Sequence, residues 1–333
     1  MPRTLRAVAL GGGHGLSATL RALRFLSEDI TAVVTVADDG GSSGRLRDEF
    51  GCLPPGDLRM ALAALCEGNE WGRTWRDVLQ HRFASDGPLG GHAVGNLLIA
   101  ALWEKLGDEV AGLDLVGRLL GAGGRVLPMS AIPLVIEADL HIEPTADSSH
   151  RGAEPVAPRT IRGQVTVAEA RGRLDNVHLV PDNPPVRPEV LQALEAADLI
   201  ILGPGSWYTS VLPHLLVPDL AAAIRSAKAR RMIVMNLAPQ DQETAGLTPA
   251  DHLRVLQDHD AALRCDTVIA DPLAVADPDD LVHSAYAMGG RVVFRQVRSA
   301  ERADVHDPLR LAAAIRDAYE GSLGDVAPNL DEE

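Results

Sequence analysis

Two glycine-rich segments near the start of the chain carry the residue types that hold phosphate groups in nucleotide-binding proteins. The first reads Gly11-Gly12-Gly13-His14-Gly15-Leu16 and follows an apolar, β-branched run. Glycines let backbone N–H groups approach an anion closely, and the beginning of a helix adds a partial positive charge there. The spacing differs from the GxGxxG of dinucleotide dehydrogenases, and the Lys-Ser/Thr pair of a P-loop is missing. The segment is a candidate phosphate-binding turn, with a purely structural turn as the alternative.

The second segment combines carboxylates with hydroxyl and guanidinium groups, in the order Asp38, Asp39, Ser42, Ser43 and Arg45. The aspartates could hold a Mg²⁺ ion bound to a diphosphate, or one could accept hydrogen bonds from sugar hydroxyls. A third interpretation is that they only cap the turn. Because adjacent side chains need not point the same way, we expect one aspartate to face a ligand and the other to be structural. Arg45 is the arginine closest to the glycines and could pair with phosphate oxygens.

Two further segments begin helices with polar side chains. Asp57 follows a Pro-Pro-Gly turn and is expected to cap a helix. The segment Gly91-His92-Ala93-Val94-Gly95-Asn96 opens a strongly apolar helix. Asn96 could form hydrogen bonds with an anion or a base, or the two glycines of this segment could instead serve close helix packing. Both interpretations stay open from the sequence.

A fourth polar loop follows a clean apolar strand and reads Gly203-Pro204-Gly205-Ser206. Its backbone amides, together with Ser206, Thr209 and Ser210, could form a second anion-binding nest. Asn236 ends the next strand at a matching position. Several polar loops at one edge of a sheet are less easily explained by chance than any one of them alone.

Alternating strands and helices must position these loops. The apolar patterns predict strands over 5–10, 31–36, 125–127, 197–202, 231–236, 267–270 and 291–297. Helices are expected over 16–25, 58–65, 71–80, about 94–105, 108–120, 208–216, 218–229, 250–259 and 308–319. Strand–helix–strand spacing implies right-handed βαβ units and a parallel sheet. The expected fold class is α/β, a Rossmann-like, doubly wound, mainly parallel sheet with helices on both faces.

The middle of the chain departs from this alternation. Patchy strand patterns cover 132–142 and 160–169, and the polar stretch 143–159 lies between them. We interpret residues of about 130–170 as a β-hairpin that projects from the core. Residues 1–325 are expected to form a single nucleotide-binding domain, followed by a flexible acidic tail over 326–333.

The composition of the chain limits the classes of molecule that it is expected to bind. The chain has 333 residues, a formal net charge of −15 and 46% hydrophobic residues. A negative field argues against nucleic acid or an anionic membrane surface as the main partner, so a phosphate ligand must be captured locally. The three cysteines are scattered without a CxxC pair, which favours reduced thiols in a cytoplasmic protein. No apolar run approaches a membrane span. A homodimer is the default expectation.

Taken together, the segments at 11–17, 35–47, 53–59, 91–96, 202–206 and 208–210 resemble the YvcK/CofD-like family, and specifically its gluconeogenesis-factor branch. The resemblance covers nearly the whole chain, and the segment at 35–47 is the most specific. It implies a Rossmann-like nucleotide-binding fold, a ligand such as UDP-N-acetylglucosamine or another UDP-sugar, and a place in carbon metabolism, cell-wall synthesis and cell shape. The better-defined enzymes among its relatives are 2-phospho-L-lactate transferases of coenzyme F420 synthesis.

The resemblance extends the candidate ligand site to Gln240, and the chain departs from the family pattern at three places. His14 stands where threonine is usual, which could alter a phosphate contact. The run after Asn236 differs around Gln240. His306-Asp307-Pro308 replaces a His-Asp-Thr type segment, so a regulatory hydroxyl would be absent.

Two function classes follow, and a third is weaker. The preferred hypothesis is a nucleotide-sugar-binding regulator without turnover, because binding loops are present but no nucleophile–base pair is evident. It requires no cofactor, although Asp38 and Asp39 could bind Mg²⁺ with a diphosphate. The alternative is a Mg²⁺-dependent transferase of the phospholactate type, since such transfer can proceed on positioning and a metal alone. An NAD-binding oxidoreductase is disfavoured by the glycine spacing.

Overall fold

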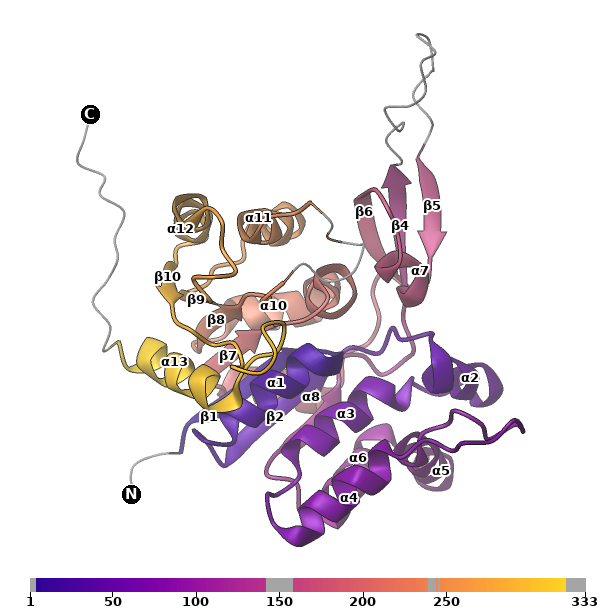
Figure 1. Cartoon of the computed structure of the whole chain (residues 1–333). Helices are drawn as coiled ribbons and strands as arrows, with labels where there is room; N and C mark the ends of the chain where they lie inside the picture. The colour runs from indigo at the N-terminus through magenta and orange to yellow at the C-terminus, as the bar shows by residue number, and fades with distance from the viewer. Residues whose placement is uncertain (1–3, 142–157, 239–243, 245, 322–333) are drawn as a thin grey trace, which may run out of the picture.

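The computed structural model describes residues 4–141, 158–238, 244 and 246–321. Its centre is a seven-stranded sheet in the order β10-β9-β8-β7-β1-β2-β3 (Figure 1), and each neighbouring pair is parallel. The strands are β1 (Arg6–Gly11), β2 (Asp29–Val34), β3 (Arg125–Pro128), β7 (Leu199–Leu202), β8 (Arg230–Val234), β9 (Thr267–Ala270) and β10 (Arg291–Phe294). The expected α/β, parallel-sheet fold is confirmed.

Strand order makes the sheet doubly wound. From β1 the chain moves outward through β2 to β3, and then returns to β7 on the other side of β1 and moves outward again to β10. Right-handed crossovers in opposite directions place their helices on opposite faces of the sheet. Ligands of such folds bind where the direction reverses, at the carboxyl ends of the two central strands. Here these strands are β1 and β7.

The helices between β1 and β3 are α1 (Gly13–Leu23), α2 (Gly41–Phe50), α3 (Pro55–Leu65), α4 (Glu70–Gln80), α5 (Val94–Leu106) and α6 (Glu109–Leu120). Those that follow are α7 (Gln164–Ala168), α8 (Pro188–Ala196), the π-helical turn η1 (Trp207–Val211), α9 (Pro213–Leu216), α10 (Pro218–Ser226), α11 (Pro249–His259), α12 (Pro278–Ala287) and α13 (Pro308–Glu320). Helix α1 packs against α3 and α13, whereas α10 packs against α8 and α9. Among the described residues, no helix combines the length and hydropathy of a membrane span.

A second, small sheet projects from the main body (Figure 1). It is antiparallel, in the order β5-β4-β6, with β4 (Val135–His141), β5 (Arg159–Arg162) and β6 (Arg173–Val180). The pairing of β4 with β5 confirms the expected hairpin. The third strand, β6, is missing from the sequence prediction, because its half-exposed residues include charged ones at irregular positions. The tip expected over 143–159 falls almost entirely outside the described residues.

Four other elements differ from the prediction. The strand expected over 160–169 ends at Arg162, because Gly163 has φ +99° and turns the chain into α7. The glycine- and serine-rich run after Asp39 is the helix α2, which is stabilised by packing against α3 and α5 despite weak helix formers. Helices α8 and α12, each with a proline in its first turn, were also not predicted.

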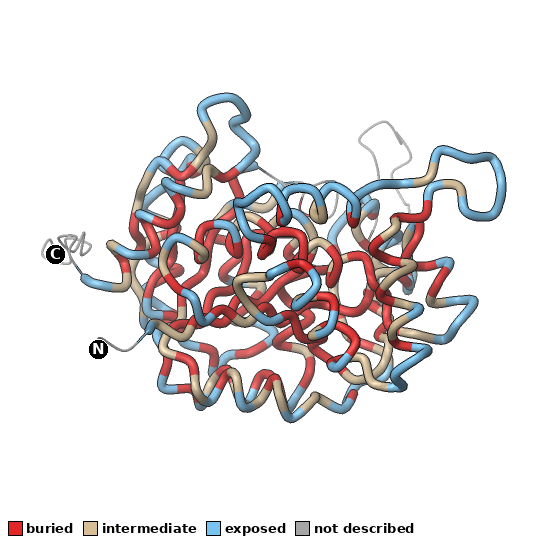
Figure 2. The backbone as a smooth tube through the Cα atoms, turned by 90° about the horizontal axis from the view of Figure 1, so that it is seen from below, coloured by how far each residue is buried: buried red, intermediate tan, exposed pale blue. Residues whose placement is uncertain are grey.

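The core is a continuous apolar cluster on both faces of the main sheet. Strand β7 is fully buried along its length, and β1 and β2 are buried over their carboxyl-terminal halves. Figure 2 shows buried backbone concentrated in the interior and exposed backbone on the outer turns. Strands buried on both faces hold the loops at their ends in fixed positions, which is what a binding site at the edge of the sheet requires.

Candidate functional site at the carboxyl edge of the sheet

The first and fourth glycine loops touch each other. They follow β1 and β7, which are paired neighbours. A Cβ atom added to Gly15 would lie 2.1 Å from the carbonyl oxygen of Pro204 and 2.7 Å from the Cα of Gly205. Only a glycine therefore allows the first turn of α1 to lie this close to the second loop. Two segments almost 190 residues apart meet at the point where the sheet reverses direction.

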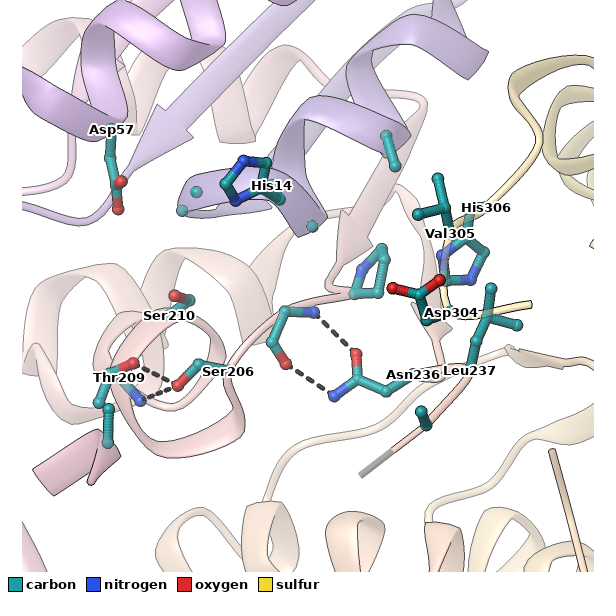
Figure 3. Close-up of a pocket in the computed structure, with 18 of the residues that line it drawn as sticks. His14, Asp57, Ser206, Thr209, Ser210, Asn236, Leu237, Asp304, Val305 and His306 are labelled. Carbon is teal, nitrogen blue, oxygen red and sulfur yellow. Dashed lines mark hydrogen bonds between the residues drawn. The ribbon is translucent and has the colours of Figure 1, made fainter. Parts of the chain in front are cut away.

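A cavity of about 480 Å³ opens between these loops (Figure 3). Its wall contains residues from six regions of the chain: the two glycine loops with the helical turns that follow them, the start of α3, α7 of the small sheet, the segment after β8, and the loop before α13. The lining residues are Gly12, Gly13, His14, Gly15, Ala18, Asp57, Gln164, Ala168, Pro204, Gly205, Ser206, Thr209, Ser210, Asn236, Leu237, Ala238, Asp304, Val305 and His306. Most of the sequence-predicted glycine, hydroxyl and amide positions are thus brought together.

Helix α1 begins at the cavity, three residues earlier than predicted. Gly12 is the N-cap and the helix runs from Gly13, which has φ +57°. The N–H groups of a first helical turn have no partner within the helix. The Gly13 N–H donates to Asp57, and any other that faces the cavity is available to an anion. The first turn of α1 contains no acidic residue, and His14 is exposed. This end of the cavity therefore offers hydrogen-bond donors and a positive helix dipole.

The second loop is braced by an amide side chain. Asn236 accepts a hydrogen bond from the N–H of Gly205 at 2.9 Å and donates one to its carbonyl oxygen at 2.8 Å. Ser206 is the N-cap of η1, where its Oγ accepts from the N–H of Thr209 at 3.2 Å and also contacts the Thr209 hydroxyl (Figure 3). Asn236 thus shapes the cavity wall by holding the backbone of Gly205, in the second glycine loop, in one conformation.

Two carboxylates converge beside the first loop. Burial, and next to it the charge of Asp38, raises the pKa of Asp57 to about 7, although a hydrogen bond from the Gly13 backbone opposes the shift. Burial also raises the pKa of Asp38, against hydrogen bonds from Gly40 and Ser43. A Cβ on Gly56 would lie 2.3 Å from the Ser43 Oγ and 3.0 Å from an Asp38 oxygen. Closely spaced carboxylates and a hydroxyl are a donor set that suits a hard cation.

Asp39 has different neighbours. Its Oδ1 accepts a hydrogen bond from the N–H of Val165 at 3.0 Å, and its Oδ2 would be 2.1 Å from a Cβ on Gly163. Asp39 therefore connects the end of β2 with the first turn of α7. The two adjacent aspartates point to different elements, Asp38 toward the first turn of α3 and Asp39 toward the small sheet.

Three residues predicted to bind the ligand, Ser42, His92 and Asn96, do not line the cavity. They form a buried hydrogen-bond network beside it. Ser42 Oγ lies 3.0 Å from His92 Nδ1 and accepts from Asn96 Nδ2 at 3.0 Å, and Arg59 Nε donates to Asn96 Oδ1 at 2.8 Å. Burial lowers the pKa of His92. This network joins α2, α3 and α5, so its direct effect is to hold α2 in place.

Arg45 is an exposed residue of α2 that faces a loop of the protein itself. It donates hydrogen bonds to the carbonyl oxygens of Gly90 at 2.8 Å and Pro88 at 3.3 Å. Leu16 is buried in the core behind the first glycine loop. Gln240 lies outside the described residues.

Three parts of the cavity wall were not predicted from the sequence. They are α7 with Gln164 and Ala168, the apolar residues after Asn236, and the loop that carries Asp304, Val305 and His306. The loop follows β10 directly, and β10 is the edge strand of the main sheet. The only available signal is the His-Asp-Pro segment at 306–308, which we interpret as a family segment that lacks its regulatory hydroxyl.

Comparison with known proteins places this geometry in a family. The family described as 2-phospho-L-lactate transferase CofD matches residues 7–298. A relative from Mycobacterium tuberculosis (strain H37Rv) is 48% identical over 96% of this chain and 92% of its own length. A Bacillus subtilis relative named gluconeogenesis factor is 35% identical over 92% of this chain and 96% of its own.

A solved structure agrees with the fold. The crystal structure of a member of the UPF0052 family from Bacillus halodurans superimposes with a TM-score of 0.82 at 33% identity, covering 95% of this chain and all of that chain. These matches confirm the resemblance seen in the sequence. The chain therefore belongs to the CofD/YvcK family, which includes UPF0052 and the bacterial gluconeogenesis factors.

Proposed function

We propose that this protein binds a nucleoside diphosphate sugar of the UDP-N-acetylglucosamine type in the cavity between the two glycine loops. We further propose that it acts as a regulator that links carbon metabolism to cell-wall synthesis and cell shape. The observation that carries the proposal is the contact of these loops at the switch point between β1 and β7. The first turn of α1 offers N–H donors to a diphosphate there. A cavity of about 480 Å³ is within the range of small-molecule sites.

A regulatory role fits the way the cavity is built. Its wall combines the main sheet with α7 of the small sheet, and Asp39 links the two through Val165. A ligand that contacts both parts would favour one arrangement of the small sheet over others, and a partner protein could detect that arrangement. The relative named gluconeogenesis factor supports a role in carbon metabolism.

Isothermal titration calorimetry tests the proposal directly. UDP-N-acetylglucosamine, UDP-glucose, NAD and GTP are titrated separately into the protein, with and without Mg²⁺. We expect saturable binding of the UDP-sugars with a Kd in the micromolar range, and weaker binding of NAD and GTP. An absence of heat with every UDP-sugar at ligand concentrations of about 1 mM would reject the proposal.

A second candidate function is phosphoryl-type transfer, as in the family description. The observation in its favour is the convergence of Asp38 and Asp57, because two carboxylates and the hydroxyl of Ser43 suit Mg²⁺. A bound Mg²⁺ would neutralise charge on a transferring phosphate group. Incubation with a guanylylated phospholactate and a deazaflavin acceptor would reveal product by mass spectrometry, and product formation without UDP-sugar binding would favour the transferase.

A further inference from the structure

One residue of the cavity wall, His306, has a hydrogen-bonding atom that no neighbour uses. The side chain is only 7% exposed, and it lines the cavity beside Asp304 and Val305 (Figure 3). Its Nε2 atom is buried and lacks a hydrogen-bond partner within the part of the chain that the structure describes. Buried polar atoms are nearly always paired, so an orphan at the wall of a cavity needs an explanation.

The protonation of the imidazole follows from its other contact. A hydrogen bond with the backbone of Met235 favours the protonated ring, which means that the ring donates to the carbonyl oxygen. Since Nε2 is unpaired, Nδ1 is the donor. Burial lowers the pKa of His306 to about 4, although the Met235 contact and the charge of Asp271 oppose the shift. At neutral pH the ring is therefore neutral, with hydrogen on Nδ1 and a lone pair on Nε2.

A second acceptor lies on another wall of the same cavity. The Oε1 atom of Gln164, on α7, is buried and has no hydrogen-bond partner among residues 4–141, 158–238, 244 and 246–321. The first turn of α1 offers N–H donors instead. The cavity therefore offers two kinds of partner: N–H donors at the first turn of α1, which suit an anion, and the unpaired acceptors of His306 and Gln164, which suit a group that carries hydrogen.

We infer that His306 is a ligand-contacting residue whose Nε2 accepts a hydrogen bond from an uncharged part of the ligand, either a sugar hydroxyl or a ring N–H of the base. A phosphate oxygen has no hydrogen to give at neutral pH, and its charge would face the lone pair of the imidazole. The inference rests on the proposed nucleotide-sugar binding and adds the orientation of the ligand, with the phosphates at α1 and the donor group at His306.

Two variants distinguish the contribution of the hydrogen-bond acceptor Nε2 from that of the space that the imidazole ring fills. His306→Phe keeps an aromatic ring without the acceptor, and His306→Gln keeps an amide that can reach the position of Nε2. We expect His306→Phe to weaken UDP-N-acetylglucosamine about tenfold and His306→Gln to stay within about threefold of the original chain. His252→Phe is the matched control, because His252 is also buried, neither of its ring nitrogens has a partner among the described residues, and it lies outside the cavity lining.

UDP alone identifies which end of the ligand provides the donor. If the donor is a sugar hydroxyl, UDP binds the original chain and His306→Phe with equal affinity. If the donor is the uracil N–H, the affinity for UDP also falls about tenfold in His306→Phe. Either pattern supports the inference. Equal affinity of both proteins for both ligands would overturn it, whereas failure of the original chain to bind any UDP compound would reject the proposed function itself.

A spectroscopic measurement covers the case in which His306→Phe does not fold. Long-range ¹H–¹⁵N correlation spectra of the original chain report the tautomer of each histidine, and the His306 signals are assigned by their loss in His306→Gln. We expect an Nδ1–H tautomer whose Nε2 resonance shifts upfield when UDP-N-acetylglucosamine is added. An Nε2 resonance that stays unchanged at saturation would overturn the inference.

Discussion

The backbone of Gly15 lies directly against the carbonyl group of Pro204, and this contact closes the candidate site. A Cβ atom at position 15 would stand 2.1 Å from that oxygen, which is far inside van der Waals contact with the backbone of the second loop. Because the loops follow the adjacent strands β1 and β7, neither can move aside without disturbing the core. The separation of the two walls of the cavity is set by this one glycine.

Gly15→Ala is expected to push the two loops apart. Overpacking against fixed backbone costs about 1–3 kcal/mol of unfolding free energy, and the displaced α1 should weaken UDP-sugar binding by about tenfold or more. Denaturant unfolding and titration calorimetry measure the two effects. Gly68→Ala is the control, since a Cβ there meets no atom within 4 Å. If both variants behave like the original chain, the contact does not shape the site.

The raised pKa of Asp57 makes stability depend on pH. The folded state holds a proton on Asp57 up to about pH 7, whereas the unfolded chain releases it near pH 4. The folded state therefore binds more protons between these values, and stability should fall as the pH rises through this window. Asp57→Asn should remove about 2–4 kcal/mol of that decline. Urea unfolding at pH 5, 6 and 7.5 measures the unfolding free energy of both proteins. If this free energy falls with pH by the same amount in Asp57→Asn as in the original chain, the raised pKa of Asp57 is contradicted.

Asp39 should act through the small sheet. Asp39→Ala removes the acceptor of the Val165 N–H and the link between β2 and α7. We expect a loss of about 1 kcal/mol in unfolding free energy, and faster hydrogen exchange at the amide of Val165. Hydrogen exchange followed by mass spectrometry or NMR reports this segment. Asp48→Ala, at an exposed position of α2, should leave the exchange rates of α7 unchanged. Unchanged exchange in both variants would show that Asp39 does not hold α7.

Asn236 should matter for the shape of the second loop. Asn236→Ala leaves both the N–H and the carbonyl oxygen of Gly205 without this side chain. Because these groups are buried, we expect a loss of about 2–3 kcal/mol of unfolding free energy together with weaker ligand binding. Asn183→Ala, at an exposed position, is the control. Retention of full stability by Asn236→Ala would mean that water replaces the amide.

The sequence predicted the sheet and the loops at the ends of β1, β2 and β7, because apolar strands followed by glycine are local patterns. It also offered Asp38 and Asp39 as a possible Mg²⁺ site, whereas in the structure Asp39 accepts from Val165 and the charge of Asp38 acts on Asp57. The proximity of Asp38 and Asp57 depends on how α3 packs beside the first loop, which no local pattern reveals. Gln164 and His306 were missed for the same reason: each lies on a segment whose position is fixed only by tertiary packing.

A crystal structure of the protein with UDP-N-acetylglucosamine tests the central claim most directly. We predict diphosphate oxygens within hydrogen-bond distance, about 3 Å, of the N–H groups in the first turn of α1, with the rest of the ligand reaching toward His306. A ligand that occupies another surface, and does not enter the cavity between the two glycine loops, would contradict the account.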